Sequence, residues 1–249
     1  MQIFNSKGSL ITDMQSWEHA FKEVDSAKHW KPGYSAHALA KHFTSPSVED
    51  SHGLVFLKQN LTNFGYSDII FETGKIEHES TLDEFGKGRL HDLFIRGKTG
   101  NRNLLVYVEA KVNESFGLTT EKTIFERLKN SPDSKIRQRI DRIADLLSLE
   151  YEDVQTLRYQ LLTYIIGALN EAGITEEPIV YLPVISYKTE NYDFMHSLNN
   201  MEDYITAMES LGFHRYNIDG TIMFENEYYT IPVISSYNVV QEASKIEVF

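Results

Sequence analysis

Residues 89–117 read RLHDLFIRGKTGNRNLLVYVEAKVNESFG, and this stretch decides the fold class. It contains two runs typical of β-strands, 90–95 and 104–110, which a polar turn with glycines separates. The second run is almost continuously apolar or β-branched, as expected for a central strand that is covered on both faces. The stretch therefore predicts two strands of a sheet that lies inside a layered fold.

The flanking sequence alternates between helical and strand-like periodicity. Helices are predicted at 14–24, 36–43, 47–64, 134–149, 152–171 and 202–211, and further strands at 68–72, 178–186, 221–224 and 228–235. Ser35 and Ser47 are the predicted N-caps of the second and third helices. This order predicts an α/β fold with a central mixed β-sheet flanked by helices. We expect an N-terminal helical extension at 1–46, a core at 47–190 and an acidic α+β extension at 191–249 that packs on the same domain.

The charge is unevenly distributed along the chain. The protein has 24 Lys+Arg against 36 Asp+Glu, a net charge of −12, which by itself disfavours binding to nucleic acid. However, residues 171–249 contain three basic and thirteen acidic residues, so residues 1–170 carry only −2. Two local stretches, 86–103 and 122–142, each carry +4. The first part of the chain is therefore compatible with a nucleic-acid partner, although not with tight, sequence-independent binding at physiological salt.

The chain contains no cysteine. This excludes a disulfide scaffold, a thiolate zinc site and a catalytic thiol, and it fits a reducing, cytoplasmic location. The N-terminal residues lack the features of a signal peptide, and no apolar run approaches the ~18 residues of a membrane span. We therefore expect a soluble cytoplasmic protein that does not act at a membrane.

Charged residues lie inside the first central strand-like run and at the end of the second. Asp92 lies in the first run, and Glu109-Ala110-Lys111 ends the second. Since successive side chains of a strand alternate between its faces, Glu109 and Lys111 point to the same side. If the strands are neighbours, the carboxylates of Asp92 and Glu109 form an oxygen site with the main-chain carbonyl of Ala110, suited to Mg²⁺ or Mn²⁺. Such a metal would neutralise charge on a phosphate and activate a water, which Lys111 would orient or deprotonate.

A structural alternative accounts for the same residues. In it, Asp92 and Glu109 lie at strand ends in solvent and form ion pairs with Arg89, Arg96 or Lys111. An acid-x-Lys tripeptide occurs at 109–111 and again at 133–135, so the tripeptide alone is not informative. Local features leave both interpretations open.

The motifs of the central stretch resemble those of the PD-(D/E)XK superfamily, the restriction-endonuclease-like nucleases. HDLFI at 91–95 and VEAK at 108–111 match its two site-bearing strands. The chain is most similar to a group of poorly characterised bacterial proteins, through Trp30, Gly33, Ser35, Ala36, Glu77, His78, Glu114, Phe116, Gly117 and Arg158 to Leu162. The resemblance covers roughly residues 28–190. It implies a restriction-endonuclease-like core of a helix, three strands, a helix and a further strand.

The resemblance also implies a function and a role for each matching residue. Asp92, Glu109 and the carbonyl of Ala110 would bind Mg²⁺ or Mn²⁺, and Lys111 would be the catalytic lysine. The expected activity is metal-dependent hydrolysis of phosphodiester bonds, with DNA as the substrate.

Two further positions extend the expected site. Gln160 matches a glutamine on the helix that follows the strands. The upstream acid is Glu77 by the closer group resemblance, or Glu49 by its more usual position on the first helix. Leu90-His91 stands where the superfamily's proline is usual, which is a common variation.

Two other functions remain open at the level of the sequence. The fold could serve as a non-catalytic binding module in a defence or toxin-like system, with the acidic C-terminal part contacting a basic protein partner. Alternatively, that acidic part could act as an internal mimic of DNA that covers the basic cleft. A homodimer is also compatible with the sequence.

Substrate contacts are predicted within the second basic stretch, from Arg137, Arg139 and Arg142 together with Lys135, with a solvated helix face as the alternative. Two residues close to the site have open roles. His91 is expected to pack or to form hydrogen bonds, with a phosphate contact as the alternative. Glu114 is expected either to bind a second metal or orient the lysine, or to cap a turn or helix.

Overall fold

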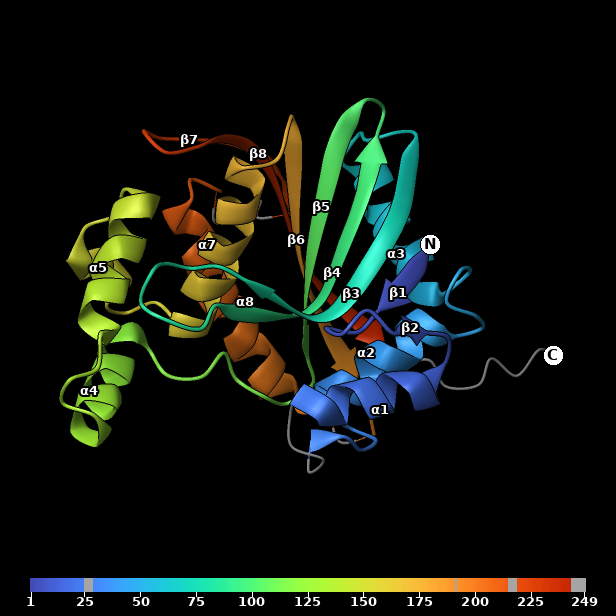
Figure 1. The fold of residues 1–249 in the computed structure, drawn as a ribbon, viewed down its shortest axis with the longest axis horizontal. Helices are drawn as coiled ribbons and strands as arrows, with labels where there is room; N and C mark the ends of the chain where they lie inside the picture. Colours follow the sequence, from blue (N-terminus) through green and yellow to red (C-terminus); the bar gives the residue numbers. More distant parts are fainter. Residues whose placement is uncertain (25–28, 191, 215–218, 243–249) are drawn as a thin grey trace.

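The computed structural model describes residues 1–24, 29–190, 192–214 and 219–242, and it is built around one mixed β-sheet (Figure 1). Within these ranges the sheet has eight strands in the order β2-β1-β3-β4-β5-β6-β8-β7. Their bounds are β1 (Gln2–Phe4), β2 (Leu10–Ile11), β3 (Ile69–Ser80), β4 (Arg89–Thr99), β5 (Arg102–Lys111), β6 (Pro178–Lys188), β7 (Gly220–Glu225) and β8 (Thr230–Gln241). The predicted α/β fold with a central mixed sheet flanked by helices is confirmed.

The middle of the sheet joins an antiparallel unit to a parallel one. β3, β4 and β5 are antiparallel neighbours, whereas β5 pairs in parallel with β6, and β6 with β8. Side chains of β5 alternate between two hydrophobic cores: Val106 and Val108 face one, and Leu105 and Tyr107 face the other. β5 is therefore covered on both faces, as its continuous apolar sequence predicts.

Helices cover both faces of this sheet (Figure 1). One core is shared with α1 (Met14–Val24), α2 (Ser35–Thr44) and α3 (His52–Asn63). The other is shared with α4 (Thr120–Asn130), α5 (Ile136–Leu147), α6 (Tyr151–Val154), α7 (Tyr159–Gly173) and α8 (Phe194–Ser210). Among the described residues, no helix combines the length and the apolar character needed to cross a membrane.

Several element boundaries differ from the predicted ones for local reasons. The strand predicted at 68–72 extends to Ser80, and the helix predicted at 152–171 is divided into α6 and α7. The last predicted helix, at 202–211, begins already at Phe194. The Asp193 carboxylate caps this helix by accepting hydrogen bonds from its first N–H groups.

Both predicted N-caps are wrong. Tyr34 is the N-cap of α2, and the Ser35 hydroxyl donates a hydrogen bond to Glu114 instead. α3 begins after Ser51, whose hydroxyl caps its first turn, while the hydroxyl of Ser47 serves the preceding turn. In each case the serine hydroxyl forms a different hydrogen bond from the helix cap that the local sequence pattern predicts.

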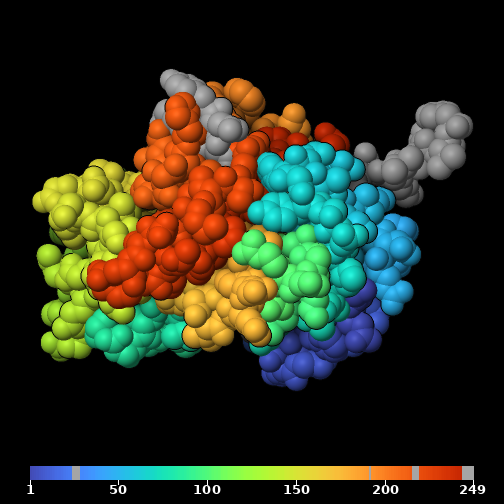
Figure 2. All heavy atoms as spheres, turned by 90° about the horizontal axis from the view of Figure 1, so that it is seen from above, coloured from blue at the N-terminus to red at the C-terminus, as the bar shows by residue number. Residues whose placement is uncertain are grey.

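The three predicted segments of the chain contribute to the same sheet. The N-terminal segment, predicted to be helical, also supplies β1 and β2 at the edge beside β3. The C-terminal segment supplies β7 and β8 at the opposite edge. In Figure 2 its orange and red residues lie between the yellow-green α5 side and the cyan and blue N-terminal part. The strands β1 and β2 were not predicted, because strands of two or three residues show too little periodicity for sequence-based prediction.

Candidate active site

The two predicted carboxylates lie side by side on β4 and β5. The antiparallel register that pairs Leu93 with Val108 places Asp92 beside Glu109 on the neighbouring strand. Asp92 Oδ2 accepts a hydrogen bond of 2.7 Å from the main-chain N–H of Ala110. Asp92 is half-buried and Glu109 is only 1% exposed. The strand pairing assumed from the sequence is therefore present, and it brings the two acids together.

Glu109 is held between two cations. Its Oε1 lies 2.9 Å from Lys111 Nζ, and its Oε2 lies 2.6 Å from Arg89 Nη2. The ion pairs of the structural alternative are thus present for Glu109, but they are buried rather than in solvent. Arg89 was not predicted as a site residue from the sequence, which indicated it only as an ion-pair partner in that alternative.

Gln160, the second residue of α7, completes the polar contacts of Glu109. Its Nε2 donates to Glu109 Oε1 at 2.9 Å, and its Oε1 accepts from Lys111 Nζ at 3.5 Å. The start of α7 is fixed by Arg158, which donates to the Gly117 carbonyl at 2.8 Å. The structure therefore places Gln160 against the lysine and the buried acid, as the family resemblance implies.

The two carboxylates differ in their electrostatic environment. Burial, assisted by the Glu109 carboxylate, raises the pKa of Asp92 to about 7, although Lys111 and Arg89 oppose the shift. Burial also acts to raise the pKa of Glu109, but Arg89 and Lys111 outweigh it and hold that pKa below its ordinary value. At neutral pH Glu109 is ionised, whereas Asp92 is close to the midpoint of its titration.

A cleft of about 480 Å³ opens beside these residues and is called the carboxylate cleft below. Its lining residues are Phe21, His29, Tyr34, Ser35, Ala36, Glu77, Arg89, Leu90, Asp92, Glu114 and Gln160. All of them lie within residues 1–170. The described part of the acidic C-terminal extension therefore does not line the cleft, contrary to the hypothesis of an internal DNA mimic.

Of the two candidate upstream acids, Glu77 lines the cleft. It lies in β3 at the position opposite Asp92 of β4. Its φ is 48°, a left-handed backbone conformation that glutamate rarely adopts and that is often found at functional sites. Glu49 is exposed, precedes α3 and is not among the residues that line the cleft. The geometry therefore favours Glu77 over Glu49.

Two sequence motifs that are far apart in the chain meet at this cleft: Ser35 and Ala36 belong to one, and Glu114 belongs to the other. Glu114 Oε1 accepts hydrogen bonds from the N–H and the hydroxyl of Ser35, both at 3.2 Å. Its Oε2 accepts from the N–H of Val112 at 2.8 Å. The Phe116 ring lies 5.0 Å from Lys111 Nζ, within the range of a cation–π contact. Glu114 thus caps both the turn after β5 and the start of α2, which is the capping role considered for it.

His91 lies on the face of β4 that packs against α7, in a buried polar network. Its Nε2 is 2.7 Å from the Ser80 hydroxyl, so the prediction of a packing and hydrogen-bonding role is confirmed. Nearby, Glu171 of α7 is 2.7 Å from His78 Nε2 and accepts a 2.6 Å hydrogen bond from the Tyr107 hydroxyl. This network joins α7 to β3, β4 and β5, and so helps to fix the position of the helix that carries Gln160.

Of the three arginines predicted to contact substrate, Arg137 lies on a different side of α5 from Arg139 and Arg142, which are three residues apart. Arg137 is exposed. Arg139 donates to Asp83 through Nε at 2.6 Å and Nη2 at 3.0 Å, and Arg142 stacks over the Tyr228 ring at 5.2 Å. Because two residues along a helix turn the side chain by about 200°, a basic run in the sequence does not become a basic stripe. The predicted set is therefore not brought together.

The candidate metal ligands are few. Within the described residues, no group of three or more His, Cys, Asp or Glu side chains is placed to hold a metal. The set that remains is the two carboxylates of Asp92 and Glu109 with the main-chain oxygen of Ala110. Such a set suits Mg²⁺, which keeps several waters and takes one or two protein carboxylates. A cation that uses Glu109 Oε2 has to compete with Arg89.

The site lies inside a region that matches a known family model. A model described as a domain of unknown function, DUF6946, matches residues 10–236 and includes every residue of the carboxylate cleft. No curated protein and no solved structure matches the chain. Because the match covers well over half of its length, the chain belongs to the DUF6946 family.

Proposed function

We propose that this protein is a metal-dependent phosphodiester hydrolase, a nuclease acting on DNA, with Mg²⁺ or Mn²⁺ held by Asp92, Glu109 and the Ala110 carbonyl. The observation that supports this most directly is that Glu109 and Lys111 form an ion pair next to Asp92, and that Asp92 lines the carboxylate cleft. The resemblance of the strand motifs to the PD-(D/E)XK superfamily supports the same assignment. The proposal extends to a cytoplasmic location, on the cysteine-free sequence alone.

The donor set fits a divalent cation with oxygen ligands. Two carboxylates lie side by side, one near the start of β4 and one near the end of β5, and burial together with this crowding raises the pKa of Asp92 to about 7. A bound cation favours the ionised form of both acids and offsets that cost. When bound, such a cation neutralises charge on a phosphate and lowers the pKa of a coordinated water.

Lys111 is the proposed catalytic residue of the chain itself. Glu109 and Gln160 hold its ammonium group at 2.9 Å and 3.5 Å, so the charge is oriented before a substrate arrives. In the proposed reaction a water oxygen attacks phosphorus, the bond from phosphorus to the leaving oxygen breaks, and Lys111 orients the water or stabilises the developing negative charge. Gln160 is a positioning residue, and Glu77 is the further acid of the cleft.

The second candidate function is a non-catalytic binding module in a defence or toxin-like system. The buried pairing of Glu109 with Arg89 and Lys111 favours it, because this pairing neutralises the acid without any metal. A basic protein partner for the acidic C-terminal part, and a homodimer, belong to this candidate on sequence grounds. Titration calorimetry separates the two functions: Mg²⁺ or Mn²⁺ binding that disappears in Asp92→Ala supports the hydrolase.

The deciding experiment is a cleavage assay on plasmid and oligonucleotide DNA with Mg²⁺ or Mn²⁺. We expect cleavage by the native chain and none by Asp92→Ala or Lys111→Ala. Asp133→Ala is the matched control, because Asp133 belongs to the second acid-x-Lys tripeptide and is exposed. Absence of cleavage, or cleavage that survives both site substitutions, contradicts the proposal.

A further inference from the structure

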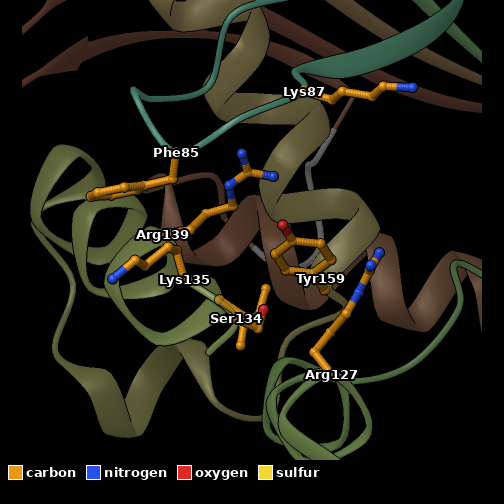
Figure 3. Close-up of a pocket in the computed structure, with 8 residues that line it drawn as sticks. Phe85, Lys87, Arg127, Ser134, Lys135, Arg139 and Tyr159 are labelled. Carbon is orange, nitrogen blue, oxygen red and sulfur yellow. The ribbon is translucent and has the colours of Figure 1, made fainter. Parts of the chain in front are cut away.

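A basic hollow lies beside the carboxylate cleft, between α4, α5 and the connection from β3 to β4 (Figure 3). The volume of this hollow is about 340 Å³. Its polar lining consists of Lys87, Arg127, Ser134, Lys135, Arg139 and Tyr159. Arg127, Ser134, Lys135 and Arg139 lie in the second basic stretch, whereas Lys87 and Tyr159 come from other segments, so the order of residues did not show the complete set. We call the hollow the basic groove.

A third hollow adjoins both the basic groove and the carboxylate cleft. This connecting hollow shares Lys87, Arg127 and Arg139 with the basic groove. The same connecting hollow is lined by Arg89 and Gln160, which also line the carboxylate cleft. A chain-like ligand with one group at Asp92 can therefore pass along α7 into the basic groove.

The charges of the groove are available to a ligand. Within the described part of the chain, Lys87, Arg127 and Lys135 form no ion pair with a carboxylate, and all three are exposed. Arg139 is different, because the buried Asp83 carboxylate binds its Nε and Nη2 and so fixes the guanidinium in place. The groove thus combines one fixed cation, whose charge is largely compensated, with three uncompensated ones.

Two helix starts add to the positive potential. α5 begins at the groove with Lys135 as its N-cap, and a lysine side chain has no acceptor to satisfy the first N–H groups. α7 begins with Tyr159, which also lines the groove, after an Arg158 N-cap that makes no side-chain capping bond. Helix N-termini of this kind favour phosphate groups.

We propose that the basic groove binds the phosphodiester backbone of the DNA strand that flanks the bond placed at the carboxylate cleft. Lys87, Arg127 and Lys135 contact successive phosphates, and the Ser134 and Tyr159 hydroxyls supply neutral donors. This inference rests on the proposed nuclease function for the position of the reacting phosphate. Of the set predicted from the sequence, Lys135 and Arg139 line the groove, whereas Arg137 and Arg142 lie outside its lining.

The test is DNA binding measured by fluorescence anisotropy, with labelled single-stranded and duplex oligonucleotides in EDTA so that no cleavage occurs. The variant is Arg127→Gln with Lys135→Gln. The matched control is Lys122→Gln with Lys129→Gln, which removes two exposed charges from α4 beside another hollow. We expect the groove variant to bind about tenfold more weakly, and its log Kd to depend on log salt with a slope reduced by about 2, whereas the control keeps the native slope.

The outcomes separate this inference from the proposed function. Equal losses in the groove variant and the control, or no DNA binding by the native protein, overturn the groove assignment even if cleavage is observed. A selective loss in the groove variant supports the groove. If the native protein then fails to cleave DNA with Mg²⁺ or Mn²⁺, the groove stands and the nuclease proposal falls.

Discussion

The carboxylate cleft and the basic groove are both charged, but they are built in opposite ways. In the cleft the charges lie on adjacent strands, and Glu109, 1% exposed, touches both Arg89 and Lys111. In the groove the cations lie on helices and a connection, and Arg127 and Lys135 are exposed without a carboxylate partner among the described residues.

Because of this difference, we expect substitutions at the cleft to change mainly the stability of the protein and substitutions at the groove to change mainly its DNA affinity. A buried charge must be paired, so removal of one partner leaves the other desolvated and costs several kcal/mol. An exposed cation costs little to remove, and its main effect is on the potential that a ligand meets. Measurements of unfolding should therefore report on the cleft, and measurements of DNA affinity on the groove.

The largest expected effect is on stability, from Glu109→Ala. We expect the free energy of unfolding to fall by about 3–5 kcal/mol, because Arg89 and Lys111 are left as buried, unpaired cations. Urea denaturation at pH 7 measures it. Arg127→Ala in the groove is the comparison and should change the value by less than about 0.5 kcal/mol. A small loss in Glu109→Ala would show that water reaches the two cations and that the cleft is not a closed, paired site.

Asp92→Asn should remove a pH dependence of stability. The pKa of Asp92 is raised from 3.8 to about 7, so the folded chain binds this proton more tightly than the unfolded chain. Its stabilising contribution is fully present below about pH 4 and is lost as pH rises through about 7. The native protein should therefore lose stability relative to Asp92→Asn over this window, by on the order of a few kcal/mol.

Thermal or urea unfolding of both proteins from pH 4 to pH 8 measures this difference. Glu109 is present in both, so the fall in its contribution at acid pH cancels. Mg²⁺ at pH 8 should stabilise the native protein and leave Asp92→Asn unchanged, because only the native chain retains both carboxylates. Parallel pH profiles for the two proteins would mean that Asp92 ionises as freely as an exposed acid.

The part of the site that lies on β4 and β5 could be predicted from the sequence, because the side chains of a strand alternate between its faces with a period of two residues. The alternation of β5 placed Glu109 and Lys111 on one face, and the short turn between β4 and β5 made Asp92 their neighbour. The same reasoning predicted the central buried strand and the mixed sheet. These features depend on local periodicity, which the sequence carries directly.

The remaining features depend on tertiary packing. Arg89 and Arg96 were equally plausible partners for Glu109, and only the structure shows that Arg89 is the one in contact. Glu77 lies beyond the end of its predicted strand, in a left-handed conformation that no local pattern indicates. The rotation of α5 about its axis, which decides where Arg139 points, is set by the residues buried beneath it.

Gln160→Ala tests how far α7 supports the site residues on β4 and β5. Without the amide, Lys111 loses its 3.5 Å contact and Glu109 loses its 2.9 Å donor, so the lysine is less well oriented. We expect kcat of DNA cleavage to fall about tenfold with little change in KM, which corresponds to about 1.4 kcal/mol of transition-state stabilisation.

Gln138→Ala, at an exposed position of α5, is the control and should keep the native kcat. A role in orienting Lys111 should also move the pH profile of kcat, which a purely structural role would not. A change confined to KM would instead place Gln160 in substrate binding.

The smallest effect is expected from Arg137→Gln combined with Arg142→Gln. Both residues belong to the basic run in the sequence, but Arg137 faces another hollow and Arg142 stacks over Tyr228. DNA affinity should change by less than about twofold, and the salt slope should stay close to that of the native protein. The Arg127→Gln and Lys135→Gln variant removes the same number of charges and is the direct comparison. If the Arg137 and Arg142 variant loses more affinity, the DNA follows the outer side of α5, and the basic groove is not the path of the backbone.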